Sequence, residues 1–422
     1  MSPGGSAHDS RRVPVWRLPG MLALVVVSLT GFTGYAALLP VAPLWAVHGG
    51  ANPAGAGLVN GTLLLATILT QLLVPAALRR FGWGPVMAAG MVLLGVPALL
   101  YALSDGLGPI LALSALRGIG FGILTVTGSA ATALLVEPSR RGEAIGIYGL
   151  AIALPNLLLL PIGPWAAAHL GYTVVFVVSA APLLGIPAAI RLAHAVQHHL
   201  RSESQPEHHA ADLAAGLTSD LTAGTTSGTA PAAGSNTAAY RRLARPTILL
   251  LGVTLAGGAV LTFSPQMVTS PLLTAAGLFL MGLVAAVTRW YAGLLADRHG
   301  DQRFAWPLVI TTTIGMAVIA LSVRDPAATD PTLFLIGMAV VGISYGALQS
   351  LTLVIAFASV SRAHHNLASA VWNIGFDAGT AIGSVLVGTL AVATSFPPAL
   401  LAAAALSLLT LPLALHRGSR GS

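Results

Sequence analysis

The chain has 422 residues, of which 55% are hydrophobic and only 8% are charged. Soluble globular proteins carry about 25% charged residues, so this chain cannot cover a water-exposed surface with ionic groups. All of its basic residues except histidine are arginine, and cysteine is absent. A chain without lysine or cysteine has no P-loop lysine for ATP, no Schiff-base lysine, no thiolate nucleophile and no disulfide framework. The composition predicts a polytopic membrane protein without an ATPase site of its own.

A helix needs roughly 20 apolar residues to cross a bilayer. Twelve such runs, rich in Leu, Ala, Val and Gly, lie near residues 20–46, 55–78, 85–104, 109–136, 144–168, 172–192, 247–269, 272–296, 305–323, 332–358, 367–393 and 397–415. They are too long and continuous for the alternating pattern of a membrane β-barrel. The first run is also too long for the apolar core of a signal peptide, so we interpret it as the first span. The predicted fold class is all-α and polytopic, with twelve transmembrane helices.

Arginines fall on one side of these spans. The two tails and the even-numbered loops hold seventeen, whereas the odd-numbered loops hold only Arg324, which Asp325 and Asp330 flank. Cytoplasmic loops of membrane proteins carry the excess of positive charge, so both termini are predicted to be cytoplasmic. The arginine-only, alanine-rich composition is typical of a GC-rich bacterial genome. We therefore expect the bacterial cytoplasmic (inner) membrane.

The spans divide six and six around a segment that begins rich in histidine and continues in Thr, Ser, Gly and Ala. This composition buries too little apolar surface to offset its ordering entropy, which favours a disordered linker. The histidines also suggest metal binding, but without cysteine or a fixed ligand spacing we favour a solvated segment and expect no metal site. The predicted organisation is an N-terminal tail (1–19), a six-helix bundle (20–193), a cytoplasmic linker (194–246), a second six-helix bundle (247–415) and a C-terminal tail (416–422).

Two motifs recur in both halves. Gly118-Ile-Gly-Phe-Gly122 in the fourth span matches Gly342-Ile-Ser-Tyr-Gly346 in the tenth, and residues 79–82 align with residues 297–300 after the second and eighth spans. Internal repeats in a six-plus-six arrangement are typical of transporters whose site lies between the halves. Duplication of a purely structural membrane protein would leave the same trace.

The most informative ionisable residue is Asp377, the only acidic residue deep within a span. A charge at the centre of a membrane helix costs roughly 2.5–3.5 kcal/mol. Asn373, Asp377 and Thr380 have i, i+4, i+7 spacing, so this polar face should point into the protein. Burial disfavours a charged carboxylate, which makes Asp377 a candidate proton carrier. The alternatives are a structural anchor that ties helices together and a direct contact with substrate.

Arg117 lies about eight residues into the fourth span and keeps its positive charge. It is a candidate to attract an anionic substrate, to pair with Asp377 or to bias a nearby protonation. A side chain that snorkels to the outer interface is the alternative.

A third pattern follows the eighth span, where Arg289 and Gly293 precede Asp297-Arg298-x-Gly300. Gly293 lets helices approach closely, and Gly300 permits a tight turn. Asp297 can face the positive N-terminus of a neighbouring helix, a weak bond that a rocking motion can break. We interpret these five residues as a gating loop.

These residues resemble the major facilitator superfamily of secondary transporters. The 293–300 stretch resembles its signature loop, here in the repeated position. Residues 117–122 and 137–142 resemble the fourth span and following loop of efflux-type bacterial members, and residues 372–379 resemble the eleventh span of the arabinose-efflux-permease-like branch. The resemblance implies two six-helix bundles with alternating access to a central cavity lined by spans one, four, seven and ten, and proton coupling for Arg117.

The first half departs from the family pattern. Gln71, Pro75 and Arg79 replace the arginine, glycine and aspartate found in the second half, so the usual latch from this loop to the eleventh span cannot form. Residues 149–156 of the fifth span are also a poor match to the Gly-Pro pattern associated with antiporters.

Neutral hydrogen-bonding groups are predicted to line the cavity. They are Thr30, Thr33, Gln266, Tyr345, Gln349, Thr352 and Asn373. They favour an uncharged, amphipathic or mildly anionic small molecule.

The sequence thus predicts a proton-coupled exporter of a small organic compound. We expect protons and the lipid bilayer as partners, no nucleic acid, no cofactor and no enzymatic activity, since HExxH, P-loop and nucleophile-elbow signatures are missing. One rival is an importer of a sugar-like or other small nutrient. The other is a transport-silent receptor or assembly partner, for which the linker is the only candidate module.

Overall fold

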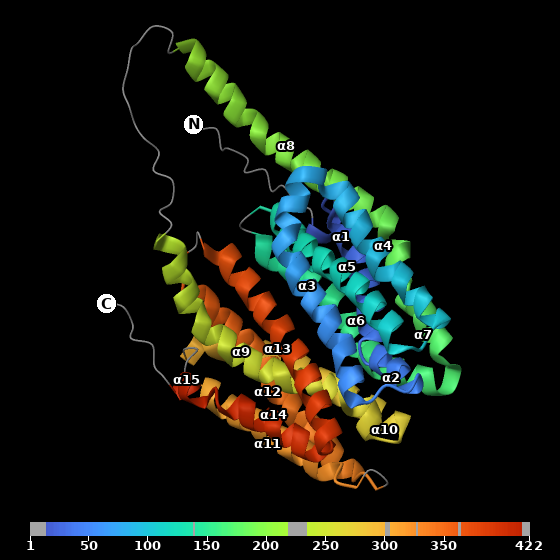
Figure 1. The fold of residues 1–422 in the computed structure, drawn as a ribbon. Coiled ribbons are helices and arrows are strands. Elements are labelled where there is room, and N and C mark those ends of the chain that lie inside the picture. Colours follow the sequence, from blue (N-terminus) through green and yellow to red (C-terminus); the bar gives the residue numbers. More distant parts are fainter. Residues whose placement is uncertain are drawn as a thin grey trace, which may run out of the picture.

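The computed structural model describes residues 14–137, 140–217, 234–299, 304–325, 328–361 and 364–415, and its regular elements there are helices (Figure 1). Twelve of these helical stretches are long and apolar enough to cross a membrane. The predicted all-α fold class and the twelve spans are therefore confirmed, and the chain is a multi-pass membrane protein.

The first bundle holds six spans. They are α1 (Met21–Leu38) with α2 (Val41–His48), α3 (Pro53–Phe81), α4 (Trp83–Leu100), α5 (Leu107–Leu134), α6 (Arg141–Leu170), and α7 (Tyr172–Ser179) with α8 (Ile186–Leu217). Short 3-10 turns lie at Val15–Arg17 (η1), Tyr101–Leu103 (η2) and Ala181–Gly185 (η4).

The second bundle repeats the arrangement. Its spans are α9 (Gly234–Met267), α10 (Pro271–His299), α11 (Ala305–Ser322), α12 (Pro331–Ala358), α13 (His365–Ala393), and α14 (Phe396–Leu408) with α15 (Leu411–Leu415).

Local sequence explains where several helices begin and end. Asn52 caps α3, because its side chain accepts a 2.9 Å hydrogen bond from the Gly55 N–H and Pro53 follows at the first helical position. Asp330 caps α12 in the same way through the N–H groups of residues 332 and 333. Gly82 separates α3 from α4 with a φ of 79°, a left-handed conformation that favours glycine.

Helices extend into both ends of the segment predicted as a linker. α8 continues to Leu217, beyond the bundle (Figure 1), and α9 begins at Gly234. The Ala-, Leu- and Arg-containing sequence after residue 194 favours helix continuation, which the low-complexity interpretation did not weigh. Residues 218–233 lie outside the described residues.

The repeated glycine motif serves the same contact in both bundles. A Cβ on Gly118 of α5 would overlap the Leu63 carbonyl of α3, and a Cβ on Gly346 of α12 would overlap the Ala285 carbonyl of α10. The fourth span thus packs on the second as the tenth packs on the eighth. Small residues let membrane helices approach closely, where packing rather than the hydrophobic effect drives association.

The two bundles contact each other through α3 with α13 and α6 with α10. The close approaches lie toward one end of the helices: Gly57 faces the Ser384 backbone, and Gly388 faces the Pro53 carbonyl. Figure 1 shows α3 and α13 converging toward this end. At the opposite end of α3, Leu73 and Phe81 are 66% and 60% exposed. The bundles therefore meet at the end predicted to lie outside the cell.

Gly346→Ala should destabilise the second bundle, because the added methyl group overlaps backbone. Overpacking costs about 1–3 kcal/mol, which we expect as a lower unfolding temperature in detergent. Gly149→Ala is the matched control, since its Cβ would meet no atom within 4 Å. Equal unfolding temperatures for the two variants would contradict the packing argument.

Candidate functional site

Asp377 connects the two bundles. It lies on α13 and is 5% exposed, and its carboxylate Oδ2 accepts a 2.9 Å hydrogen bond from the Nε2 amide of Gln71 on α3. The same amide donates to Thr125 Oγ1 on α5 at 3.3 Å. The buried carboxylate of the second bundle is thus held by a side chain of the first.

The other members of the polar face on α13 bond only within their own helix. Asn373 donates to the Ser369 carbonyl at 2.9 Å, and Thr380 donates to the Phe376 carbonyl at 2.9 Å. Neither bond links α13 to another helix. Of the three stripe residues, Asp377 is the one that bonds across the bundles.

Arg117 is fully buried inside the first bundle, so it does not snorkel to an interface. Its Nη2 donates a 2.7 Å hydrogen bond to the Gly34 carbonyl on α1, and its guanidinium lies 5.9 Å from the centre of the Tyr101 ring. Its Nε and Nη1 atoms are enclosed without a hydrogen-bond partner. No hydrogen bond or ion pair links Arg117 to Asp377 in the described part of the chain.

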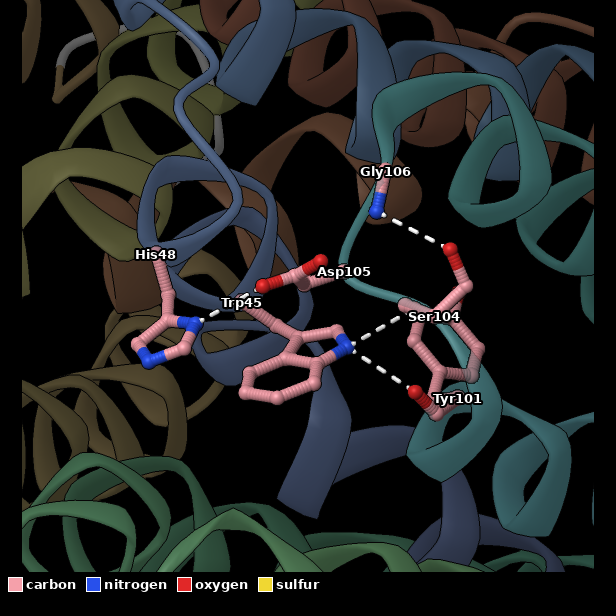
Figure 2. Close-up of polar contacts among 6 residues, drawn as sticks. All are labelled: Trp45, His48, Tyr101, Ser104, Asp105 and Gly106. Carbon is pink, nitrogen blue, oxygen red and sulfur yellow. Dashed lines mark hydrogen bonds and ion pairs between the residues drawn. The ribbon is translucent and has the colours of Figure 1, made fainter.

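Contacts between loop residues hold the Tyr101 ring in place beside Arg117 (Figure 2). Trp45 Nε1–H donates to the carbonyls of Tyr101 and Ser104 at 2.9 and 3.0 Å, and His48 Nδ1 lies 3.1 Å from an Asp105 carboxylate oxygen. These contacts hold the end of α2 against the 101–106 loop. They position the ring over which the guanidinium lies.

Tyr35 of α1, which sequence reasoning missed, packs against the span that carries Arg117. It stacks on Phe121 of α5 with ring centres 3.8 Å apart, and Phe121 follows Arg117 by four residues on the same helix face. A tyrosine in an apolar span has no sequence pattern that marks this position. Tyr35 therefore joins α1 to α5 beside the turn that carries Arg117.

The predicted residues of α12 converge inside the second bundle. Arg289 Nη2 of α10 donates to Gln349 Oε1, Trp372 Nε1 donates to Thr352 Oγ1 at 3.1 Å, and Tyr345 packs against Gly257. Gln349 and Thr352 are buried, and Tyr345 is half-buried.

The first bundle contains the equivalent of the Arg289–Gln349 bond. Gln71 occupies the position of Arg289 in the repeat, and its bond to Thr125 joins α3 to α5 as Arg289 joins α10 to α12. Although Gln71 departs from the family pattern, it keeps the hydrogen bond between the second and fourth spans and adds one to Asp377.

The remaining predicted cavity residues lie elsewhere. Thr30 donates to the Val26 carbonyl at 2.8 Å beside η4, Gln266 donates to the Thr262 carbonyl at 3.3 Å, and Thr33 is half-buried on α1. None of the three bonds to Asp377 or Gln71 among the described residues.

The structure describes side chains only at the start of the predicted gating loop. Gly293, Asp297 and Arg298 belong to α10, but their side chains lie outside the described residues, as does Gly300 entirely. The predicted latch through Asp297 therefore remains a prediction.

A second polar link joins the bundles nearer the predicted outer end. Asn60 Nδ2 on α3 donates to Thr262 Oγ1 on α9 at 3.0 Å, and that hydroxyl lies 2.8 Å from Ser384 Oγ on α13. Together with the glycine contacts, this link closes the outer seam.

The chain is similar to known transporters in sequence and in structure. The family model described as Major Facilitator Superfamily matches residues 24–323 and 248–420. A bacterial homologue of the human lysosomal transporter Spinster, in its inward-facing and occupied conformation, has a TM-score of 0.66 at 14% identity, covering 93% of this chain and 94% of that one. A mutant of the peptide transporter POT in complex with alafosfalin has a TM-score of 0.66 at 16% identity, with 94% of each chain covered. No curated protein matches the sequence.

Gln71→Ala should open the outer seam more often, because it removes a hydrogen bond to a carboxylate across the bundles. Such bonds contribute about 1.5–3 kcal/mol, so the population with a separated seam should rise about tenfold or more. The chain has no cysteine, so Ser384→Cys gives a single thiol buried in that seam. Its rate of modification by a membrane-impermeant maleimide measures the opening.

Asn373→Ala is the control, since Asn373 bonds only its own helix. An unchanged rate in the Gln71→Ala background would show that the Gln71–Asp377 bond does not hold the bundles together.

Proposed function

The chain belongs to the major facilitator superfamily, a family of transporters and not of enzymes, and is a secondary transporter of that type; on this premise we propose that it exports a small organic compound in exchange for protons that bind Asp377. The observation that carries the proposal is the 2.9 Å hydrogen bond from Gln71 to the Asp377 carboxylate. It joins a buried ionisable group of one bundle to the other bundle.

We place the protein in a bacterial cytoplasmic membrane with both termini inside, as the arginine distribution supports. In that orientation the close contacts between the bundles lie at the outer end, as expected for an inward-facing state. The resemblance of residues 117–122 and 372–379 to efflux-type members supports export.

The Gln71–Asp377 bond gives protonation a mechanical consequence. An ionised carboxylate accepts a charge-assisted hydrogen bond worth about 1.5–3 kcal/mol, whereas a bond between neutral groups contributes about 0.5–1.5 kcal/mol. A proton on Asp377 therefore weakens the contact between α3 and α13. The bundles can then rock apart at the outer end.

Two opposing effects act on the protonation of Asp377 in this cycle. The Gln71 amide donates to Oδ2 and favours the ionised carboxylate. Burial in the apolar core favours the protonated form. The balance lets the carboxyl group change state within a transport cycle.

Asp377→Asn should abolish proton-driven export. We would measure accumulation of a labelled-compound panel in efflux-deficient bacteria that express wild type or variant, with and without a protonophore. Wild type should lower the accumulation of at least one compound, and the protonophore should abolish this effect. The variant should lose most of it, because asparagine cannot carry a proton.

Thr389→Val is the matched control on α13 and should export like wild type, because Thr389 is exposed and its hydroxyl donates to the Val385 carbonyl of its own helix. Wild-type export by Asp377→Asn under a proton gradient would refute the coupling role. Higher accumulation with wild type would mean import, and the efflux proposal would be withdrawn.

A further inference from the structure

The outer face of α8 carries a basic stripe toward its predicted cytoplasmic end. Five exposed residues follow one another at spacings of four, three, four and three, which places them on one helix face: Pro187, Arg191, His194, His198 and Arg201. The opposite face, which includes Leu192 and Val196, is buried in the core of the first bundle. The stripe therefore belongs to a helix that is firmly packed on its other side.

The same side of α8 is apolar before the stripe begins. Leu184 of η4 and Ile190 of α8 are 78% and 41% exposed. Figure 1 shows α8 on the outside of the first bundle, with its end extending beyond the other helices. An exposed apolar surface on the outermost helix of a membrane protein meets lipid chains. Arg191 and the residues after it thus lie where the lipid chains give way to the headgroups.

Neighbouring elements add positive charge at this end of the bundle. A Cβ on Gly82, which follows α3, would lie 3.4 Å from Gln197 Nε2 of α8, and a Cβ on Gly20, which precedes α1, would meet Ala195 of α8. The segments that end at these glycines carry three further exposed arginines: Arg17, Arg79 and Arg80. The stripe is therefore part of a wider basic surface.

The carboxylates that the structure describes do not neutralise the stripe. At this end of the first bundle they are Glu137 and Glu143, and Glu143 pairs with Arg140 at 3.3 Å. No ion pair among the described residues includes Arg191 or Arg201.

The order of the side chains along the stripe favours an anion over a metal ion. His194 and His198 have the i, i+4 spacing that suits a metal ion. However, Arg191 and Arg201 flank them with positive charge that repels a cation. Guanidinium groups instead donate paired N–H groups to phosphate oxygens, and each imidazole supplies a further donor.

We propose that the basic stripe of α8, formed by Arg191, His194, His198 and Arg201, binds the phosphate headgroup of an anionic phospholipid in the cytoplasmic leaflet. The acyl chains of that lipid lie on the apolar surface around Ile190. This lipid site goes beyond the proposed transport function and does not depend on proton coupling through Asp377. It anchors the last helix of the first bundle at the membrane surface.

Lipid binding to the purified full-length protein in a neutral detergent tests the proposal. Phosphatidylglycerol is the anionic probe, and phosphatidylcholine with the same acyl chains is the probe without net charge. Native mass spectrometry measures the affinity of the first bound molecule of each lipid. Glycerol 3-phosphate, which carries the phosphate without acyl chains, serves as the competitor.

Wild type should bind phosphatidylglycerol about 10- to 30-fold more tightly than phosphatidylcholine, because each arginine near an anionic lipid contributes about fivefold. Arg191→Gln and Arg201→Gln should each lower this preference about fivefold, and Arg191→Lys should keep most of it. Arg324→Gln is the matched control, since Arg324 is exposed at the predicted outer end. It should bind like wild type. Glycerol 3-phosphate at the concentration that saturates the lipid site should leave the lipid bound.

Three results would overturn the proposal. They are equal affinities for the two lipids, an unchanged preference in either glutamine variant of the stripe, and displacement of the lipid by an equal concentration of glycerol 3-phosphate. The last result would assign the stripe to a soluble phosphate compound. All the substituted side chains are exposed, so unfolding temperatures equal to that of wild type should accompany each change in lipid preference.

Discussion

The structure depends on the burial of one carboxylate within the membrane. An unpartnered charge at that depth is expensive, so Asp377 must either be neutral or receive a hydrogen bond from the protein. The partner that the fold supplies is Gln71, which belongs to the opposite bundle. A requirement of local electrostatics is thereby met by a contact between the two bundles, and in the proposed mechanism the charge on this side chain sets how firmly the bundles hold together.

The contacts between α3 and α13 form the seam on which this effect acts, and α6 with α10 forms a second contact between the bundles. Glycine faces on α3 and α13 allow their backbones to meet near the predicted outer end, and the Asn60–Thr262 hydrogen bond adds a polar link there. Beyond Gln71, α3 carries exposed apolar side chains, among them Leu73 and Phe81. Since lipid competes equally for apolar helix surfaces, close packing and hydrogen bonds decide which face pairs. A change at Asp377 thus acts on one of the polar contacts that hold this seam together.

The sequence predicted those features of the fold and site that follow from composition and local residue spacing. Apolar runs of span length gave the twelve helices, and the glycine motifs around residues 118–122 and 342–346 matched because they serve the same contact in each bundle. Asp377 stood out as the one deep carboxylate. Its partner Gln71 did not stand out, because it lies 306 residues away and belongs to a segment that departs from the family pattern. No sequence pattern marks Tyr35, and the hydrogen bond that Thr352 accepts from Trp372 was not predicted. Such pairings depend on how helices pack, which a single sequence does not specify.

The most direct test of the central claim is the distance between the predicted cytoplasmic ends of α3 and α13 as a function of pH. The cysteine-free chain allows spin labels at Phe81→Cys and Ala370→Cys alone, both at exposed positions. In lipid nanodiscs, double electron–electron resonance should show shorter distances gaining population in wild type as the pH falls, because protonated Asp377 holds the inward-facing state less firmly. Asp377→Asn should give a distribution that does not change with pH. The same pH response in wild type and Asp377→Asn, or no response in wild type, would contradict the account.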